Sequence, residues 1–455
     1  MPQAQHQSHR FADTLKRLLR RNAGPNIRKI LERTHPVDLA GVLGQFIPDD
    51  QLRLLSLAGG NTMQAEVVSA LSMRMATDLV EQMPLDRAVA IVREMSGDDS
   101  ADLLGELEET LSAKIIEAMP VEESEEVTEL LRYGEATAGG IMSPDVLAIP
   151  QDMSASEAIL TVQESPDVEM AFYLYVVNDH DSLVGVLSLR QLVTCRPESI
   201  IKDIMNPQVV SVKTEEDQEE VARIVSRYDF LAVPVVDDTN RLVGMVTVDD
   251  VIDVIREEAT EDILKMAGAG DNYDERRSPL RSIWLRAPWL SAALVGGIVA
   301  SFVITGFEET LARYLPLAAF IPVIIGMAGN VGTQSLAIVV RGLATRKIDV
   351  KKFWRVVGSE ILVGAVLGIL FGVALGAMGF FRFRGDSVAD PFLLAVAVGS
   401  ASAVAMVLAA TVAAAIPMLF ARLHIDPAVA TGPFVTTAVD IIGVIVYFNI
   451  VTAIV

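Results

Sequence analysis

The sequence is poor in the residues that build disulfides and soft-metal sites, with one cysteine and five histidines among 455 residues. The single cysteine, Cys195, excludes an internal disulfide and fits a reducing compartment. The N-terminus up to Arg21 is rich in Gln, His and Arg and lacks an apolar core of signal-peptide length. No phosphate-cradling ATPase motif is present. We therefore expect residues 1–285 to lie in the cytoplasm and any transport to be passive.

Basic residues are outnumbered by acidic ones in the first part of the chain. Residues 1–285 hold 51 Asp and Glu against 26 Lys and Arg, whereas residues 286–455 hold 8 against 11. A domain with this acidic surplus repels nucleic acid phosphates and attracts cations. The alternative is an acidic surface that serves only solubility. Nucleic acid is not an expected partner in either case.

Five runs of about 20 or more mostly apolar residues predict membrane-spanning helices. The segment between the second and third runs is strongly basic, which predicts that it is cytoplasmic. With the acidic region inside, five crossings of the cell inner (plasma) membrane place the C-terminus outside. The runs are 287–307, 315–340, 356–381, 391–420 and 428–455.

Asp440 is the only charged residue in the last apolar run. A carboxylate at bilayer depth costs several kcal/mol unless it faces protein or water, which favours an ion or proton pathway. Gly432 and Pro433 predict a break in the helix, and carbonyls freed by such a break are tolerated only where they line a cavity or are buried. Together with the hydroxyls of Thr436 and Thr437, these oxygens suit a hard cation. The alternative is an Asp hydrogen-bonded between packed helices without a transport role.

The second apolar run carries glycines at every third position, Gly326, Gly329 and Gly332. Such spacing allows close backbone approach between helices, which explains the glycines without invoking transport. It explains less well the four polar residues beside them: Asn330, Thr333, Gln334 and Ser335. Glu360, in the third run, is the other acidic group within a predicted span, but it lies near the basic loop and is a second-tier candidate.

The cytoplasmic region contains an internal repeat, in which residues 141–144 match 204–207 and residues 175–185 match 234–244. Each unit reads as a leading segment, a helix, two strands joined by a polar turn, and a second helix. Units this small are expected to pack on each other. The pattern resembles a pair of cystathionine-β-synthase-type (CBS) domains over about residues 137–257.

The CBS resemblance implies a candidate nucleotide site after the last strand of the second copy. In that family this stretch often binds adenosine phosphates. The segment 244–249 resembles the nucleotide-binding form, which implies that Thr247 contacts the phosphate and Asp249 accepts hydrogen bonds from the ribose hydroxyls. The first copy carries Arg190 where the ribose carboxylate would be. At most one ATP site is implied, and the alternative is a pair that only dimerises.

Residues 25–133 read as helices of about ten residues broken at Pro or Gly, a pattern typical of a stacked, curved array. At one break, Asp98 and Asp99 are natural first-turn residues, and Asp102 shares their face. These carboxylates could share a divalent cation with another domain. Further on, Asp253, Glu257 and Glu261 recur every four residues, a spacing that opposes a helix unless a cation or basic partner neutralises them.

Three motifs now stand in order along the chain: the acidic linker at 257–262, Met-Ala-Gly-Asn-Val-Gly-Thr-Gln-Ser at 327–335 and Gly-Pro-Phe-Val-Thr-Thr-Ala-Val-Asp at 432–440. With the helical N-domain and the CBS pair, they resemble the MgtE family of magnesium channels over about residues 25–455. The resemblance implies a multidomain integral membrane protein, not an enzyme. Its parts are a flexible N-terminus (1–24), an all-α superhelical N-domain (25–135), tandem α/β CBS domains (136–257), a connecting plug helix (258–285) and a five-helix transmembrane domain (286–455).

The resemblance also implies a homodimer with its pore on the two-fold axis. Asp440 corresponds to the pore carboxylate, with the backbone near Thr436 beside the hydrated ion, and Gly432 stands where some members carry a polar pore residue. Internal Mg2+ would close the pore by binding between the N-domain, the CBS pair and the plug helix. The matching regulatory positions are Asp98, Asp102, Asp249, Asp250, Asp253, Glu257, Glu258 and Glu261.

Three other functions are weighed against a Mg2+ channel. A transporter of Co2+, Mn2+ or Ni2+ would use the same oxygen ligands. A membrane-tethered metal or nucleotide sensor would explain the CBS pair but not the last apolar run. An intramembrane aspartyl protease would need a second intramembrane Asp facing Asp440, which the predicted spans lack.

Overall fold

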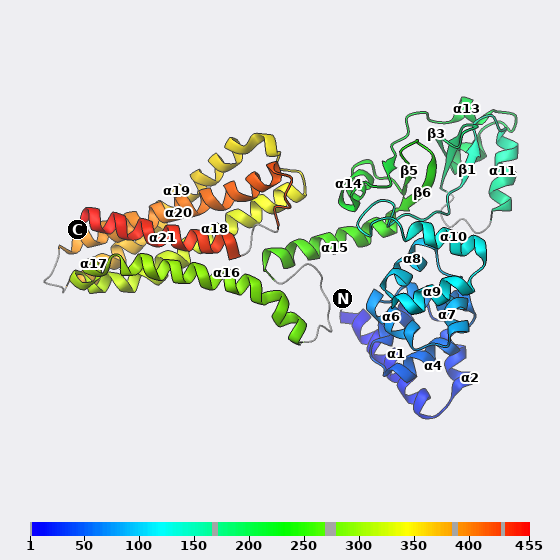
Figure 1. Cartoon of the computed structure of the whole chain (residues 1–455), viewed down its shortest axis with the longest axis horizontal. Coiled ribbons are helices and arrows are strands. Elements are labelled where there is room, and N and C mark those ends of the chain that lie inside the picture. Colours follow the sequence, from blue (N-terminus) through cyan, green and yellow to red (C-terminus); the bar gives the residue numbers. More distant parts are fainter. Residues whose placement is uncertain (1, 166–171, 269–278, 385–389, 429–432) are drawn as a thin grey trace. The chain divides into compact units, whose positions relative to one another are not determined.

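The computed structural model describes residues 2–165, 172–268, 279–384, 390–428 and 433–455 (Figure 1). The chain divides into two compact units, unit 1 up to Arg256 and unit 2 from Glu257. Unit 1 contains the N-domain and the CBS pair, and unit 2 contains the apolar helices.

The N-domain is an array of short helices in which each helix packs on the one two places further along the chain. Proline at the first turn starts several of them, because its missing N–H and fixed φ suit that position. The array agrees with the stacked helices that the sequence predicts. The helices are α1 (Pro2–Arg20), α2 (Gly24–Leu31), α3 (Pro36–Leu43), α4 (Pro48–Leu57), α5 (Asn61–Ser69), α6 (Met73–Glu81), α7 (Leu85–Val92), α8 (Gly97–Glu106), α9 (Glu109–Ala118) and α10 (Val121–Leu130).

Helix α1 differs from the flexible N-terminus that the sequence predicts for residues 1–24. Ala12, Leu15 and Leu19 are buried and belong to the same apolar core as the rest of the N-domain. Their spacing of three and four residues forms one apolar stripe, which gives the helix a face to bury against α2 and α3.

Each CBS copy forms a three-stranded sheet with one parallel and one antiparallel pairing. The two sheets share a register shift at the equivalent place, Val176/Val177 and Val235/Val236, which confirms the internal repeat. The elements of the first copy are β1 (Ala148–Pro150), α11 (Ala155–Glu164), β2 (Tyr173–Val177), β3 (Leu183–Ser188) and α12 (Leu189–Thr194), followed by α13 (Ile201–Ile204). Those of the second are β4 (Val212–Lys213), α14 (Gln218–Tyr228), β5 (Ala232–Val236) and β6 (Leu242–Thr247).

The two copies pack on each other through their hairpin turns. The Leu183 amide donates to the Asn240 carbonyl at 3.0 Å, and the Leu242 amide donates to the Asp181 carbonyl at 3.2 Å. Asp181 and Asn240 both have positive φ, a conformation that Asp and Asn tolerate in turns. The exchange is reciprocal, as expected for two copies related by approximate two-fold symmetry.

Helix α15 (Val248–Met266) runs without interruption through the boundary at 257/258 that the sequence predicts between CBS pair and plug helix. The acidic stripe does not break it because basic side chains one turn away neutralise part of it. Asp253 pairs with Arg256 at 3.1 Å, and Glu261 pairs with Lys265 at 2.6 Å.

Among the described residues, five helices are long and apolar enough to cross a membrane, as the sequence predicts. Helix α20 is central, packing on α18, α19 and α21 through a face rich in alanine. The elements of unit 2 after α15 are α16 (Pro279–Thr305), α17 (Glu308–Arg313), η1 (Leu315–Phe320), α18 (Ile321–Ala344), η2 (Val350–Lys352), α19 (Phe353–Phe383), α20 (Pro391–Arg422) and α21 (Pro433–Ile454).

The last apolar run contains a helix that begins at Pro433, one of the two residues at which the sequence predicts a break. Helix α21 begins at Pro433, in the position where proline is tolerated best, and continues to Ile454. Gly432 lies outside the described residues. Asp440 therefore sits in the second turn of one continuous helix.

Candidate ion path and regulatory sites

Helix α21, which carries Asp440, is held in unit 2 by aromatic and polar contacts along its length. The Phe434 ring packs nearly perpendicular to the ring of Trp289 in α16, with centroids 6.4 Å apart. Near the other end, the buried Tyr447 hydroxyl donates to the Leu317 carbonyl at 2.8 Å. These contacts fix which side of α21 faces protein.

Asp440 lies beside the glycine motif of α18. A Cβ on Gly329 would be 3.8 Å from Oδ1 of Asp440, and a Cβ on Gly332 would be 3.4 Å from the Val439 side chain. The Thr333 hydroxyl donates to the Gly329 carbonyl at 2.8 Å. The two motifs that the sequence places in separate apolar runs therefore meet at one place in the fold.

Polar side chains next to this contact are exposed on the protein surface. Asn330, Thr333 and Gln334 are exposed at spacings of three and four residues on α18, whereas Ser335 is buried. Thr436 and Asp440 on α21 are partly buried. Exposed polar groups at bilayer depth require water or another protein surface, because lipid tails offer them no partner.

Glu360 is separate from this group. It lies in the second turn of α19, which packs on α20, whereas Asp440 lies on α21 beside α18. Glu360 is therefore not part of the polar group around Asp440.

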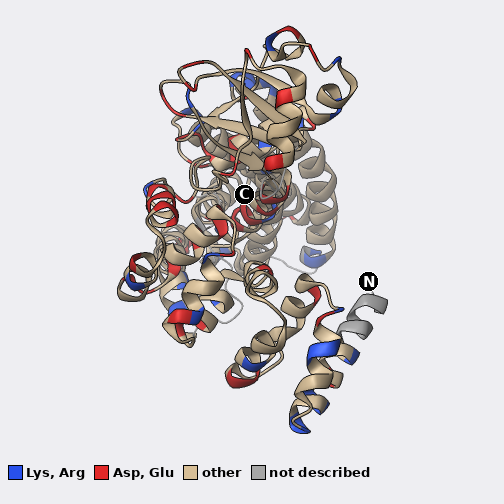
Figure 2. Cartoon of the chain, turned by 90° about the vertical axis from the view of Figure 1, so that its right-hand side faces the viewer, with Lys and Arg blue, Asp and Glu red and all other residues tan. Residues whose placement is uncertain are grey.

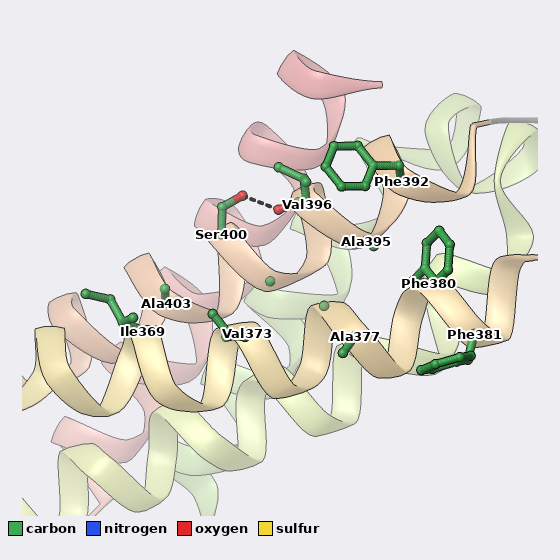
Figure 3. A pocket seen from close by; sticks show the side chains of 13 residues that line it. Ile369, Val373, Ala377, Phe380, Phe381, Phe392, Ala395, Val396, Ser400 and Ala403 are labelled. Carbon is green, nitrogen blue, oxygen red and sulfur yellow. Dashed lines mark hydrogen bonds between the residues drawn. The ribbon is translucent and has the colours of Figure 1, made fainter.

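A cavity of about 660 Å3 opens between α19 and α20 (Figure 3). Its lining is apolar apart from Ser400, whose hydroxyl donates to the Val396 carbonyl at 2.7 Å. Without a charged side chain or a free carbonyl directed into it, this cavity is a poor cation site.

In unit 1, acidic residues occur on many of the helices (Figure 2). Asp98 lies in the first turn of α8, and its Oδ1 atom is buried without a hydrogen-bond partner in the described part of the chain. Burial and the neighbouring charge of Asp99 raise the pKa of Asp98 to about 6.

Asp250, in the first turn of α15, lies close enough to Asp98 for the two carboxylates to repel. Burial raises the pKa of Asp250 to about 7, with the charges of Asp98 and Asp249 adding to it, although a hydrogen bond from the Thr247 hydroxyl opposes the shift. The structure therefore brings together one N-domain and one CBS candidate.

A second acidic pair lies at the same contact between N-domain and CBS pair. Burial, followed by the charge of Asp145, raises the pKa of Glu126 in α10. Gly97 of α8 packs against Pro144, where a Cβ would be only 2.9 Å from the proline ring. Glu126 and Asp145 were not among the residues predicted from the sequence, although Asp145 directly follows Ile-Met-Ser-Pro at 141–144, the first copy of a repeated motif.

The other candidate regulatory residues are not gathered at the Asp98–Asp250 pair. Among the described residues, no group of three or more His, Cys, Asp or Glu is close enough to hold a metal ion. Glu258 and Glu261 are partly buried; the exposed candidates are Asp102, Asp249, Asp253 and Glu257.

The candidate nucleotide residues lie at the end of β6 and the start of α15. Thr247 is buried and its hydroxyl donates to Asp250, while Asp249 is exposed. In the first copy, Ser188 and Gln191 make the same contact three residues apart, as a reciprocal helix cap. Gln191 is thus the structural counterpart of Asp250, and Arg190 that of Asp249.

Comparison with known proteins agrees with these parts and their order. A family model described as divalent cation transporter matches residues 321–450, the MgtE intracellular N domain matches 34–136, and CBS domains match 138–198 and 201–257. A crystal structure of the cytosolic domain of the Mg2+ channel MgtE in complex with ATP is 37% identical, with TM-score 0.52, and covers 53% of this chain and 99% of that one.

Full-length relatives extend the similarity into the membrane domain. The magnesium transporter MgtE of Thermus thermophilus is 36% identical over 97% of this chain and 98% of its own length. The magnesium transporter MgtE of Bacillus subtilis is 33% identical over 96% of this chain and 95% of its own length. The protein is a membrane-spanning transporter, not an enzyme, with cytosolic N-terminal domains. It belongs to the MgtE family.

Proposed function

We propose that this protein is a Mg2+ channel that admits the ion passively between two copies of the chain. One observation carries the proposal: Asp440, the one carboxylate of α21, lies beside the segment of α18 that carries exposed polar residues, in helices that are mostly apolar. A second copy facing this surface would cover the polar groups and enclose a water-filled path.

A homodimer would also place two Asp440 carboxylates at one axis. Mg2+ gives up its water reluctantly and is usually bound by one or two carboxylates while it keeps several waters. Two Asp440 side chains, with hydroxyls and carbonyls near Thr436, would select such a hydrated ion. The names of the relatives favour Mg2+ over Co2+ or Mn2+ as the transported ion.

Membrane potential is a sufficient driving force. A divalent cation that moves inward across 100 mV gains about 4.6 kcal/mol. The basic segment between α18 and α19 favours a cytoplasmic location for that loop, and five spans then place the C-terminus outside the cell membrane.

Cytosolic Mg2+ is proposed to close the pore through unit 1 and α15. Asp98 and Asp250 ionise reluctantly because they are partly buried close to each other, so a divalent cation between them would offset both desolvation and repulsion. Weaker Mg2+ sites would be formed by the other acidic candidates, which are Asp102, Asp249, Asp253, Glu257, Glu258 and Glu261. Several sites are needed, because a shift from mostly open to mostly closed requires about 5 kcal/mol of differential binding.

ATP is proposed as a second regulatory ligand of the CBS pair, bound through Thr247 and Asp249. The proposal is supported by the ATP complex of the similar cytosolic domain. The first copy lacks a carboxylate at both equivalent positions, Arg190 and Gln191, so one site per chain is proposed.

Ion flux into liposomes tests the proposal against the sensor alternative. The purified protein should pass Mg2+ under an inward-negative potential, and the rates for Co2+, Mn2+ and Ni2+ measured beside it give the selectivity. A protein that binds Mg2+ but passes no divalent cation would be a sensor and not a channel.

A further inference from the structure

The cavity between α19 and α20 is a groove whose floor consists of small residues. A Cβ on Gly372 would be 2.6 Å from the Gly399 carbonyl oxygen, and a Cβ on Gly376 would be 3.0 Å from the Ala395 carbonyl oxygen. Such close approach of two backbones is typical of small residues at helix contacts in membranes. The floor therefore has no side chain long enough to fill the space above it.

Larger apolar side chains line the groove beside this floor. Ile369 and Phe381 of α19 and Phe392 of α20 belong to the lining, and all three are exposed on the protein surface. Ser400 is the polar residue of the lining, and its hydroxyl already donates to the Val396 carbonyl. The groove therefore suits a hydrocarbon ligand.

The groove covers one half of each helix. Its lining runs from Ile369 to Phe381 in the second half of α19 and from Phe392 to Ala403 in the first half of α20. Ile369 and Ala403 lie toward one end of the groove, and Phe380 and Phe392 lie toward the other (Figure 3). The lining of α19 rises about 18 Å along the helix axis, and one leaflet contributes about 15 Å of hydrocarbon. The groove thus matches the acyl region of a single leaflet.

Basic side chains follow the end of the groove that lies nearest the connection from α19 to α20. Arg382 is in the last turn of α19 and Arg384 comes directly after the helix. Both are exposed, and neither has an ion-pair partner in the part of the chain that the structure describes. Asp390 opposes their charge, but its Oδ1 accepts a hydrogen bond from the Phe392 amide at 2.8 Å. Because arginine binds phosphate oxygens through charged hydrogen bonds, this end suits a lipid phosphate.

We propose that the groove binds one acyl chain of an anionic phospholipid, whose phosphate is held by Arg382 and Arg384. The chain would fill the space between the apolar side chains that the two helices leave open. Its affinity would come from van der Waals contacts, because a lipid tail gains no hydrophobic energy by leaving other lipid. The site would occur once per chain, and it would exist whether or not the protein conducts Mg2+.

The alternative occupant is a second copy of the chain. The second copy is proposed to cover the polar surface of α18 and α21, whereas the groove lies on α19, whose main packing partner is α20. Lipid chains are present at this depth in every membrane, so the groove needs no partner protein to fill it. These two observations favour the lipid.

The test is native mass spectrometry of the full-length protein in detergent, which counts bound phospholipids per chain. The probes are dipalmitoyl phosphatidylglycerol, which is anionic, and dipalmitoyl phosphatidylcholine, which is zwitterionic. The wild type should retain one phosphatidylglycerol per chain and bind it about fivefold or more tighter than phosphatidylcholine. Ser400→Phe places a ring in the groove and should weaken this binding about tenfold or more. Val404→Phe is the matched control, because Val404 is exposed on the same helix outside the lining.

Charge variants test the phosphate end of the site. Arg382→Gln combined with Arg384→Gln should abolish the preference for phosphatidylglycerol over phosphatidylcholine, because the two headgroups then meet no cation. Lys352→Gln combined with Arg355→Gln is the matched control, since these exposed basic residues lie at the other end of α19. The control should keep the preference.

Chain length tests the groove on the wild type alone. Dihexanoyl phosphatidylglycerol should bind about tenfold or more weakly than the dipalmitoyl lipid, because its short chains fill less than half of the groove. Equal binding of the two lipids, or equal binding by Ser400→Phe and Val404→Phe, would overturn the inference. Dissociation of an oligomer by Ser400→Phe with an unchanged lipid count would also overturn it and assign the groove to a second copy. A protein that passes no Mg2+ would contradict the pore and leave the lipid site standing.

Discussion

Asp98 and Asp250 come from different domains of unit 1, and the charge of Asp98 helps to raise the pKa of Asp250. Neither carboxylate has a basic side chain among the causes of its shifted pKa. A cation bound at this contact would relieve the repulsion, and under the proposed gating it would couple cytosolic Mg2+ to the packing of the N-domain on the CBS pair.

Stability of this contact without Mg2+ should fall as the pH rises. A carboxylate whose folded pKa lies above its unfolded value stabilises the folded state below about pH 4, and this contribution is lost as the pH rises through about 6 to 7. Asp98→Asn keeps the shape without the charge and should stabilise the contact by on the order of 2 kcal/mol at pH 7.5. Hydrogen exchange of α8 between pH 5 and 8 measures both effects.

Asp86→Asn is the matched control for that experiment, because Asp86 is an exposed first-turn residue of α7. Mg2+ should remove the pH dependence in the wild type by competing with protons for the same oxygens. An Asp98→Asn protein as pH-dependent as the wild type would show that the Asp98–Asp250 pair is not the regulatory contact.

Removal of the N-domain should abolish closure by internal Mg2+. A chain lacking residues 1–135 loses Asp98 and Asp102, so it should conduct at millimolar internal Mg2+ where the full chain is closed. Flux from liposomes loaded with Mg2+ measures the difference. Normal closure of the truncated chain would place the sensor entirely in the CBS pair and α15.

Two neighbouring glycines of α16 should respond oppositely to alanine. A Cβ on Gly296 would collide with the Thr437 side chain of α21, whereas Gly297 has open space around it. We expect Gly296→Ala to cost about 1–3 kcal/mol through overpacking and Gly297→Ala to be neutral or slightly stabilising. Thermal unfolding in detergent compares the two; equal melting temperatures would contradict the close approach of α16 and α21.

The full-length protein should bind about one ATP molecule per chain. Asp249→Ala should weaken the affinity for ATP about tenfold or more, because the substitution removes charged hydrogen bonds to the ribose. Arg190→Ala, at the equivalent place in the first copy, is the matched control and should bind normally. Calorimetry gives stoichiometry and affinity together. No heat from folded wild-type protein would leave the CBS pair as a packing module.

The sequence predicts best the features that depend on local pattern. The apolar runs locate five spans, and the motif around Val176 and its repeat around Val235 locate the two sheets, because hydropathy and β-branched alternation act over a few residues. The spacing of Ala12, Leu15 and Leu19 also fits an amphipathic helix. The polar residues before Ala12 favoured the prediction of a flexible segment instead.

Contacts between distant segments could not be predicted in this way. Three pairs illustrate this: Asp98 lies near Asp250, Lys265 forms an ion pair with Asp426, and Gly329 lies near Asp440. Each pair comes together only when whole domains or helices pack. The sequence supplies the residue types in each case, but no local rule pairs them. Asp98 and Asp440 were therefore predicted from their own sequence context and Asp250 through the family resemblance, whereas Lys265 and Asp426 were not predicted.

The most direct test of the central claim is Mg2+ uptake into liposomes that contain the Asp440→Ala protein, under an imposed inward-negative potential. The wild type should fill with Mg2+, whereas Asp440→Ala and Asp440→Asn should be indistinguishable from empty liposomes, because the path loses the one carboxylate of α21. Asn449→Ala, which changes a polar residue further along the same helix, should conduct normally. Wild-type flux from a folded, monodisperse Asp440→Ala protein would contradict the account.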